Sequence, residues 1–106
     1  MSRFALPLFA LLALPMTGHA ACNTAGLTSA QTDQARVLVI TNRSDAEVLR
    51  LYWIDFSGAA TLYTEIAPRA QIEQPTFTSH VWAIEGDGGA CKAVLLVDAD
   101  IDIGVR

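Results

Sequence analysis

The sequence predicts an all-β protein, an antiparallel β-sandwich of about seven short strands. Runs of β-branched and aromatic residues are separated at close spacing by clusters of turn-forming residues. None of the runs has the periodicity of an amphipathic helix. The chain has 106 residues, of which 52% are hydrophobic and 17% charged, as expected for one small folded domain rather than a disordered segment.

The first twenty residues have the pattern of a secretory signal peptide. Arg3 precedes an uncharged apolar run, residues 4–16, and small residues stand at the last and third-last positions before Ala21. The run is too short for a membrane-spanning helix, which needs roughly twenty apolar residues. We therefore expect residues 1–20 to be removed near Ala20, leaving a secreted or periplasmic protein without a membrane span. Lipidation of Cys22 is the weaker alternative, because His19 stands where lipoprotein signals have an aliphatic residue.

The mature chain divides into an irregular N-terminal arm, residues 21–35, and a sandwich domain, residues 36–106. Cys22 in the arm and Cys91 in the domain are the two cysteines. An even number of cysteines in an oxidising compartment favours a disulfide over a metal site or a redox motif. Closing so long a loop contributes roughly 4 kcal/mol in the chain-entropy model. Two free thiols are the alternative.

The charge of the chain excludes one class of partner, and its few histidines and cysteines exclude several classes of reaction. The formal net charge is −4, and it becomes −5 without the leader, because Arg3 is the leader's only charged residue. The remaining Lys and Arg residues stand singly, so a nucleic-acid partner is not expected. His80 is the one histidine after the leader, and no second histidine or free cysteine accompanies it. We therefore expect no metal, no cofactor and no enzyme activity.

The strands follow in order from the alternation of residue types. The β-branched run at residues 36–41 fits a strand buried on both faces. Between residues 48 and 56, alternation sends one set of side chains to each face, namely Leu49, Leu51 and Trp53 against Tyr52, Ile54 and Phe56. Pro68 ends the strand at 61–66, and Pro75 confines the strand at 71–77 to an edge or an irregular segment. The remaining strands are expected at 80–85, 91–97 and 98–105.

Two short motifs lie in the expected turns. Asn42-Arg43-Ser44 fits a glycosylation sequon, but the same residues are common in turns, and we favour a turn. The sequence DADIDIG, residues 98–104, resembles a calcium loop, but its glycine comes one position late and no glutamate follows. We expect its three aspartates on the outer face of the last strand, with a weak surface ion site as the alternative.

Aromatic residues concentrate between Leu49 and Trp82, where both tryptophans, both tyrosines and His80 lie. Over about residues 37–103 the chain resembles the β domain of the von Hippel-Lindau tumour suppressor family. The residues that carry the resemblance, in the family's order and spacing, are Asn42-Arg43-Ser44, Trp53-Ile54-Asp55-Phe56-Ser57-Gly58, Tyr63 and His80-Val81-Trp82.

The resemblance implies a pocket for a peptide that contains 4-hydroxyproline. In the family an aromatic box holds the ring, and a serine and a histidine bind its hydroxyl. The corresponding residues here are Trp53, Tyr63, Phe77 and Trp82 for the box, and Thr76 and His80 for the hydroxyl. Thr76 replaces the family's serine and Phe77 its usual tyrosine. The methyl group of threonine narrows such a pocket.

We therefore expect an exported, non-enzymatic module that binds a proline- or hydroxyproline-containing peptide. No ubiquitin-ligase partner is expected, since the helical domain that recruits one in the family's eukaryotic members has no counterpart in this sequence. The alternative is a structural or protein-interaction domain whose pocket is filled by its own side chains. A binding site requires Trp53 and His80 to be partly open to solvent and on the same side of their sheet, whereas a filled pocket would bury both.

Overall fold

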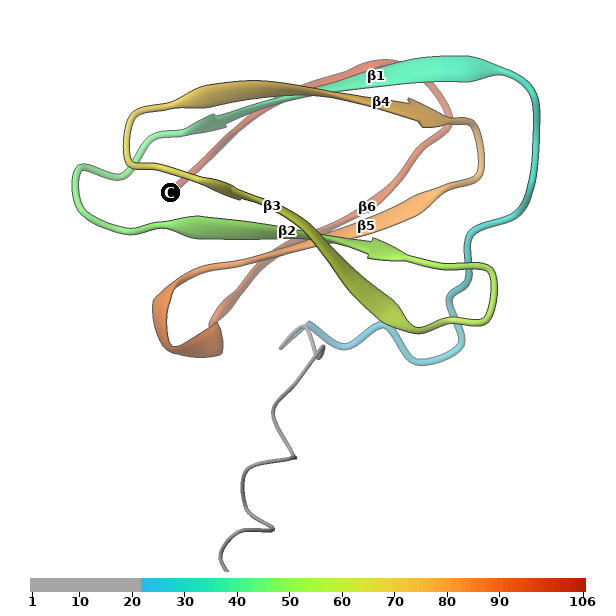
Figure 1. Ribbon diagram of the computed structural model, residues 1–106, viewed down its shortest axis with the longest axis horizontal. Coiled ribbons are helices and arrows are strands. Elements are labelled where there is room, and N and C mark those ends of the chain that lie inside the picture. Colours follow the sequence, from blue (N-terminus) through green and yellow to red (C-terminus); the bar gives the residue numbers. More distant parts are fainter. Residues whose placement is uncertain (1–21) are drawn as a thin grey trace, which may run out of the picture.

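A computed structural model describes residues 22–106, so the predicted leader lies outside the described residues. Seven strands form two sheets that face each other as the layers of a β-sandwich, which confirms the predicted fold class (Figure 1). The three-stranded sheet has the order β4 (Gln71–Phe77), β1 (Ala35–Asn42), β7 (Ile101–Val105). The four-stranded sheet has the order β3 (Ala60–Ile66), β2 (Leu49–Ile54), β5 (Val81–Glu85), β6 (Cys91–Leu96). A 3-10 turn, Asp87–Gly89, joins β5 to β6.

The strand pairing agrees with the sequence at one edge and departs from it at another. β4 lies at an edge of its sheet, as Pro75 predicts. β7 pairs in parallel with β1, whereas the other pairings are antiparallel. The chain crosses from β6 in one sheet to β7 in the other, so no hairpin imposes an antiparallel direction on this last strand.

The prediction that the first strand is buried on both faces is wrong. Leu38 and Ile40 are completely buried between the sheets, whereas Val37 is 38% exposed and Val39 is half-buried. The arm packs on the four-stranded sheet, so the outer face of β1 is left toward solvent. A β-branched run therefore marked strand propensity at this position rather than burial on both sides.

The core lies between the layers and is continued on the far face of the four-stranded sheet. Leu49 and Leu51 point into the main core, with Trp53 packed against it, as the alternation predicts. Tyr52 and Ile54 point the other way and are covered by the arm. The main core comprises Leu38, Ile40, Leu49, Leu51, Ile66, Trp82, Ile84, Val97 and Val105.

The arm is fixed by covalent and hydrogen bonds. Cys22 and Cys91 form the predicted disulfide. Because the Cys22 sulfur is bonded to Cys91, the alternative in which it carries a lipid is wrong for this structure. Buried Ser29 donates from Oγ to the carbonyl of Ile54 at 2.5 Å and accepts from the amide of Val81 at 2.8 Å. Ser29 therefore links the end of β2, the start of β5 and the arm.

Asn42 is a structural residue rather than a glycosylation acceptor. Its side chain is completely buried, and Nδ2 donates to the carbonyls of Glu47, Ile66 and Ala67 at 2.7, 3.0 and 3.2 Å. Its Oδ1 accepts from the amide of Ser44 at 2.9 Å, which shapes the turn after β1. The turn interpretation of this motif is therefore confirmed.

The prediction that three aspartates lie on the outer face of the last strand is wrong for two of them. β7 begins at Ile101, so Asp98 and Asp100 belong to the connection before it. Asp100 accepts a hydrogen bond from the amide of Val37 at 3.0 Å, which ties this connection to β1. Within residues 22–106, no group of three or more His, Cys, Asp or Glu side chains is placed to hold a metal ion.

Candidate functional site

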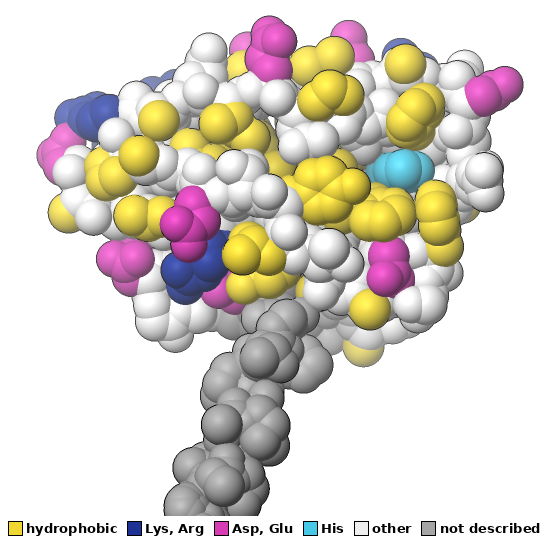
Figure 2. Space-filling view, in the orientation of Figure 1, with side chains coloured by type: hydrophobic (Ala, Val, Ile, Leu, Met, Phe, Trp, Pro, Cys, Tyr) yellow, Lys and Arg dark blue, Asp and Glu magenta, His cyan; other side chains and the backbone are white. Residues whose placement is uncertain are grey.

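A cluster of aromatic side chains lies on one face of the sandwich, around Trp53 and His80. We define the aromatic patch as Trp53, Phe56, Tyr63, Phe77 and His80. Trp53 contacts Phe56, Tyr63 and His80 with ring centroids 5.1, 6.1 and 5.5 Å apart, and Phe77 contacts His80 at 5.5 Å. Figure 2 shows the imidazole, in cyan, set among hydrophobic side chains on this face.

Cross-strand register places the two tryptophans together. Trp53 in β2 lies directly opposite Trp82 in β5 in an antiparallel pair, so both side chains are on the same face of the sheet. Trp53 is half-buried at the surface, whereas Trp82 is 2% exposed and belongs to the main core. Trp82 therefore lies beneath the patch rather than in it.

A β-bulge directs Tyr63 toward the tryptophans. Leu51 pairs with Thr64 and Tyr52 pairs with Leu62, so Tyr63 is the extra residue between them and has no register partner. Bulges turn a side chain away from the direction that strict alternation gives it. Tyr63 meets Trp82 edge to face at a centroid distance of 5.0 Å and remains 51% exposed.

Phe56 joins the patch through a tight turn after β2. The Asp55 carboxylate accepts hydrogen bonds from the Ser57 hydroxyl and from the amides of Ser57 and Ala59, at 2.7, 2.8 and 2.9 Å. These bonds lower the pKa of Asp55, the Ser57 hydroxyl contributing most. The sequence had placed Phe56 on the face opposite Trp53, which is wrong, because β2 ends at Ile54 and the turn brings the ring back.

His80 occupies the corner between β4 and β5. Its amide donates to the carbonyl of Phe77 at 3.2 Å, closing a turn that brings their two rings together. Ser79 in this turn has φ of 72°, a left-handed conformation that few non-glycine residues adopt. Its amide bonds the carbonyl of Val97, and its carbonyl bonds the amide of Ala30. The corner is thus held from both sides, by Val97 just after β6 and by the arm.

The imidazole of His80 is an acceptor within the protein. Trp53 Nε1 donates to His80 Nδ1 at 3.2 Å, so the neutral ring carries its hydrogen on Nε2. Burial lowers the pKa of His80, which keeps the ring neutral at ordinary pH. The same hydrogen bond places the two side chains on one side of the sheet, as a shared site requires.

Thr76 contacts Trp82 rather than the surface. It is 3% exposed, and its Oγ1 accepts from Trp82 Nε1 at 2.8 Å. This hydrogen bond joins β4 in one sheet to β5 in the other. The two residues form the floor of the patch, and the threonine hydroxyl lies below the surface that a ligand would touch.

The structure thus gathers the six predicted site residues in one connected cluster, but at two depths. Tyr63 and Phe77 are at the surface, 51% and 39% exposed, and Phe56, which the sequence analysis missed as a site residue, is 50% exposed beside them. Trp53 is half-buried, whereas His80 is buried with 9% exposed, so the exposure expected of a binding site holds for the tryptophan and fails for the histidine. The aromatic run from Trp53 to Phe56 was the signal available for Phe56.

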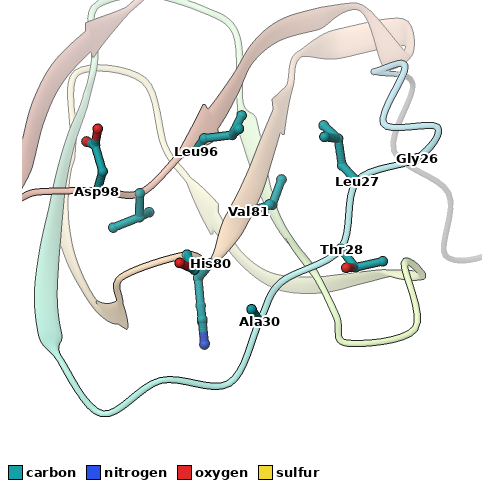
Figure 3. A pocket seen from close by; sticks show the side chains of 10 residues that line it. Gly26, Leu27, Thr28, Ala30, His80, Val81, Leu96 and Asp98 are labelled. Carbon is teal, nitrogen blue, oxygen red and sulfur yellow. The ribbon is translucent and has the colours of Figure 1, made fainter.

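A separate hollow of about 440 Å³ lies between the arm and the end of β6. In Figure 3, Leu27 and Leu96 line opposite sides of it with Val81 between them, and the His80 side chain extends away from both leucines. His80 is the only predicted site residue along this hollow. The hollow and the aromatic patch therefore meet at the β4–β5 corner.

Comparison with known proteins finds one matching family. The family described as "VHL beta domain" matches residues 27–101, which is most of the chain. No curated protein matches the chain. No helix within residues 22–106 has the length and apolar character needed to cross a membrane.

Proposed function

Because the chain belongs to the VHL beta domain family, we propose that it is an exported, non-enzymatic binding module whose aromatic patch receives a proline-containing peptide. The observation that carries the proposal is the ring arrangement around Trp53. Three exposed aromatic side chains, Phe56, Tyr63 and Phe77, surround a half-buried indole and a neutral imidazole. Export is supported by the Cys22–Cys91 disulfide, a bond typical of oxidising compartments.

The chemistry of the patch suits a pyrrolidine ring. Aromatic side chains offer large, rigid apolar surfaces at low cost in conformational entropy. Proline has a ring that can stack on these surfaces, and it restricts its own peptide to an extended form before binding. Exposed aromatic residues that are grouped, rather than scattered, are typical of interaction sites.

The binding test follows tryptophan fluorescence of the disulfide-bonded protein during titration with short extended peptides that contain one central proline or 4-hydroxyproline. We expect saturable binding of at least one peptide below millimolar concentration. Tyr63→Ala should weaken binding about tenfold, since it removes an exposed aromatic wall.

The matched control is Leu62→Ala. Leu62 is the neighbouring residue of β3 and is 47% exposed, but it pairs opposite Tyr52, whose side chain points to the other face of the sheet. This variant should bind as the unchanged protein does. Absence of binding of both peptides at millimolar concentration would reject the proposal. It would favour a structural or protein-interaction domain with a self-filled pocket, an alternative that the Thr76–Trp82 hydrogen bond supports.

A further inference from the structure

Among residues 22–106, four strands lie at the edges of the two sheets, and three of them carry features that discourage pairing with another chain. β3 has the bulge at Tyr63, and β4 contains Pro75. β7 contains Asp102 and Gly104. Residues 93–96 of β6 form a run without charge, proline or glycine, and they pair with β5 in continuous register. This part of β6 is therefore the edge best suited to pair with a further strand.

The backbone of β6 directs unpaired groups toward this edge. The amide of Val97 donates to the carbonyl of His80 at 2.9 Å, and its carbonyl accepts from the amide of Ser79 at 2.7 Å, so both groups of Val97 point toward β5. Successive residues of a strand point their N–H and C=O groups to opposite sides. Those of Leu96 and Val94 therefore point away from β5, toward the open edge.

The side chain of Leu96 is also left uncovered. At 60% it has the highest exposed fraction among the large hydrophobic side chains of residues 22–106. It lies opposite Val81, on the face of the sheet that the arm covers further along, and it is not part of the aromatic patch. A strand added to β6 would cover Leu96 and pair the outward backbone groups at the same time.

The charges at the two ends of the run favour a second copy of this chain as the added strand. Lys92 and Asp98 stand three residues before and three residues after Leu95. An antiparallel pair centred on Leu95 places Lys92 of each copy opposite Asp98 of the other, whereas a parallel pair in register places like charges together. Lys92 Nζ also bonds Glu47 Oε1 at 3.0 Å in its own chain. The contact between copies therefore fixes the direction of pairing more than it adds affinity.

We propose that β6 is a dimerisation edge, through which two copies of the chain join their four-stranded sheets into one continuous sheet. In this register Val94 of each copy exchanges hydrogen bonds with Leu96 of the other, and the two Leu95 residues lie directly opposite each other. The same surface is used on both copies, so the contact closes at two subunits. The inference stands apart from the proposed function, because none of these residues belongs to the aromatic patch.

The test is sedimentation equilibrium of the disulfide-bonded protein between about 10 µM and 1 mM. The measurement is made at about 0.15 M salt, where repulsion between two acidic chains is screened beyond roughly 8 Å. We expect a reversible monomer–dimer equilibrium with a dissociation constant below about 1 mM, as for a small interface. A chain that remains monomeric at about 1 mM overturns the proposal and leaves this edge to a strand of another protein.

Leu96→Lys tests the location of the contact. A lysine on an edge strand opposes pairing with another strand, so the dissociation constant of the dimer should rise about tenfold or more. Leu62→Lys is the matched control, because Leu62 is 47% exposed on β3, at the opposite edge of the same sheet, and the charge changes equally. It should leave the dissociation constant within about twofold of that of the unchanged protein. Equal weakening by the two variants would assign the effect to charge and overturn the role of β6.

Cysteine substitution tests the register. In the proposed pair the Cβ atoms of the two residues at position 95 are roughly 5 Å apart, so Leu95→Cys should give a covalent dimer on mild oxidation. Val94→Cys is the control, since the two residues at position 94 are about two residues out of register and too far apart for a disulfide. Mass spectrometry of proteolytic fragments identifies the linked residues. A covalent dimer of Val94→Cys, or none of Leu95→Cys, would overturn the register.

Discussion

Trp53 Nε1 donates to His80 Nδ1 across 3.2 Å, which fixes the imidazole as an acceptor at the corner between β4 and β5. Protonation of His80 would place a hydrogen on Nδ1 and convert this contact into two opposed donors. The aromatic patch is therefore arranged around a neutral histidine.

This relationship predicts a loss of stability on acidification. The pKa of His80 is lowered from 6.5 in the folded protein, so the unfolded chain binds more protons as the pH falls through this range. Stability is therefore fully present above about pH 7 and declines as the pH falls through 6.5 toward the lower folded-state pKa. The melting temperature, followed by circular dichroism, should be lower at about pH 5 than at about pH 8.

His80→Gln is the control, since glutamine does not titrate. Its melting temperature should change less over the same interval. Glu47 and Asp55 do not interfere, because their pKa values are lowered from 4.5 and 3.8, and the stability that they contribute is lost only below these values. An equal change in both proteins would contradict the prediction.

Thr76→Val should destabilise the protein by about 1–3 kcal/mol, because it leaves the buried N–H of Trp82 without its acceptor. Urea unfolding measures the change. In a Trp82→Phe background, which has no indole hydrogen, the same substitution should have little effect. Equal costs in both backgrounds would mean that the hydrogen bond between the sheets contributes nothing beyond packing.

Asn42→Ala should cost about 2 kcal/mol or more of unfolding free energy. The substitution removes the shared donor of three carbonyls, of which the hydrogen bond to Ile66 is buried and those to Glu47 and Ala67 are partly buried. Asn23→Ala is the comparison, because the side chain of Asn23 is exposed and accepts one local hydrogen bond. It should change stability by no more than about 0.5 kcal/mol. Similar costs for the two variants would contradict the structural role of Asn42.

Reduction of the Cys22–Cys91 disulfide should lower the unfolding free energy by roughly 4 kcal/mol, since the bond closes a loop with a sequence separation of 69. Thermal unfolding with and without a reducing agent measures the change. A protein with both cysteines replaced by serine should unfold at the same temperature under the two conditions. A reductant effect in that variant would assign the loss to something other than the disulfide.

Local patterns predicted most of the fold. The alternation from Leu49 to Trp53 identified the core face of β2, because side chains on a strand alternate with period two. Pro75 identified an edge strand, because proline has no backbone N–H to donate to a neighbouring strand. The parallel pairing of β7 and the exposure of Val37 were not predicted, because both depend on which layer the distant arm and the last strand join.

The composition of the candidate site was easier to predict than its depth. The family's residue spacing predicted Trp53, Tyr63 and His80 as site residues, and in the structure Trp53 contacts the other two. The burial of Thr76 could not be predicted, because its hydrogen-bond partner comes from the opposite sheet. Phe56 was placed on the wrong face, because strict alternation was continued through a turn.

The position of β1 between β4 and β7 constrains the order of assembly. The central strand of the three-stranded sheet comes early in the chain, and one of its two neighbours is the C-terminal strand. To form such pairings the chain must first lose the entropy of closing long loops, and only then do the new contacts stabilise it. Folding of comparable sandwiches therefore takes milliseconds to seconds. The sheet cannot be completed until residues 101–105 have been synthesised, and a polypeptide truncated before Ile101 would leave one edge of β1 unpaired.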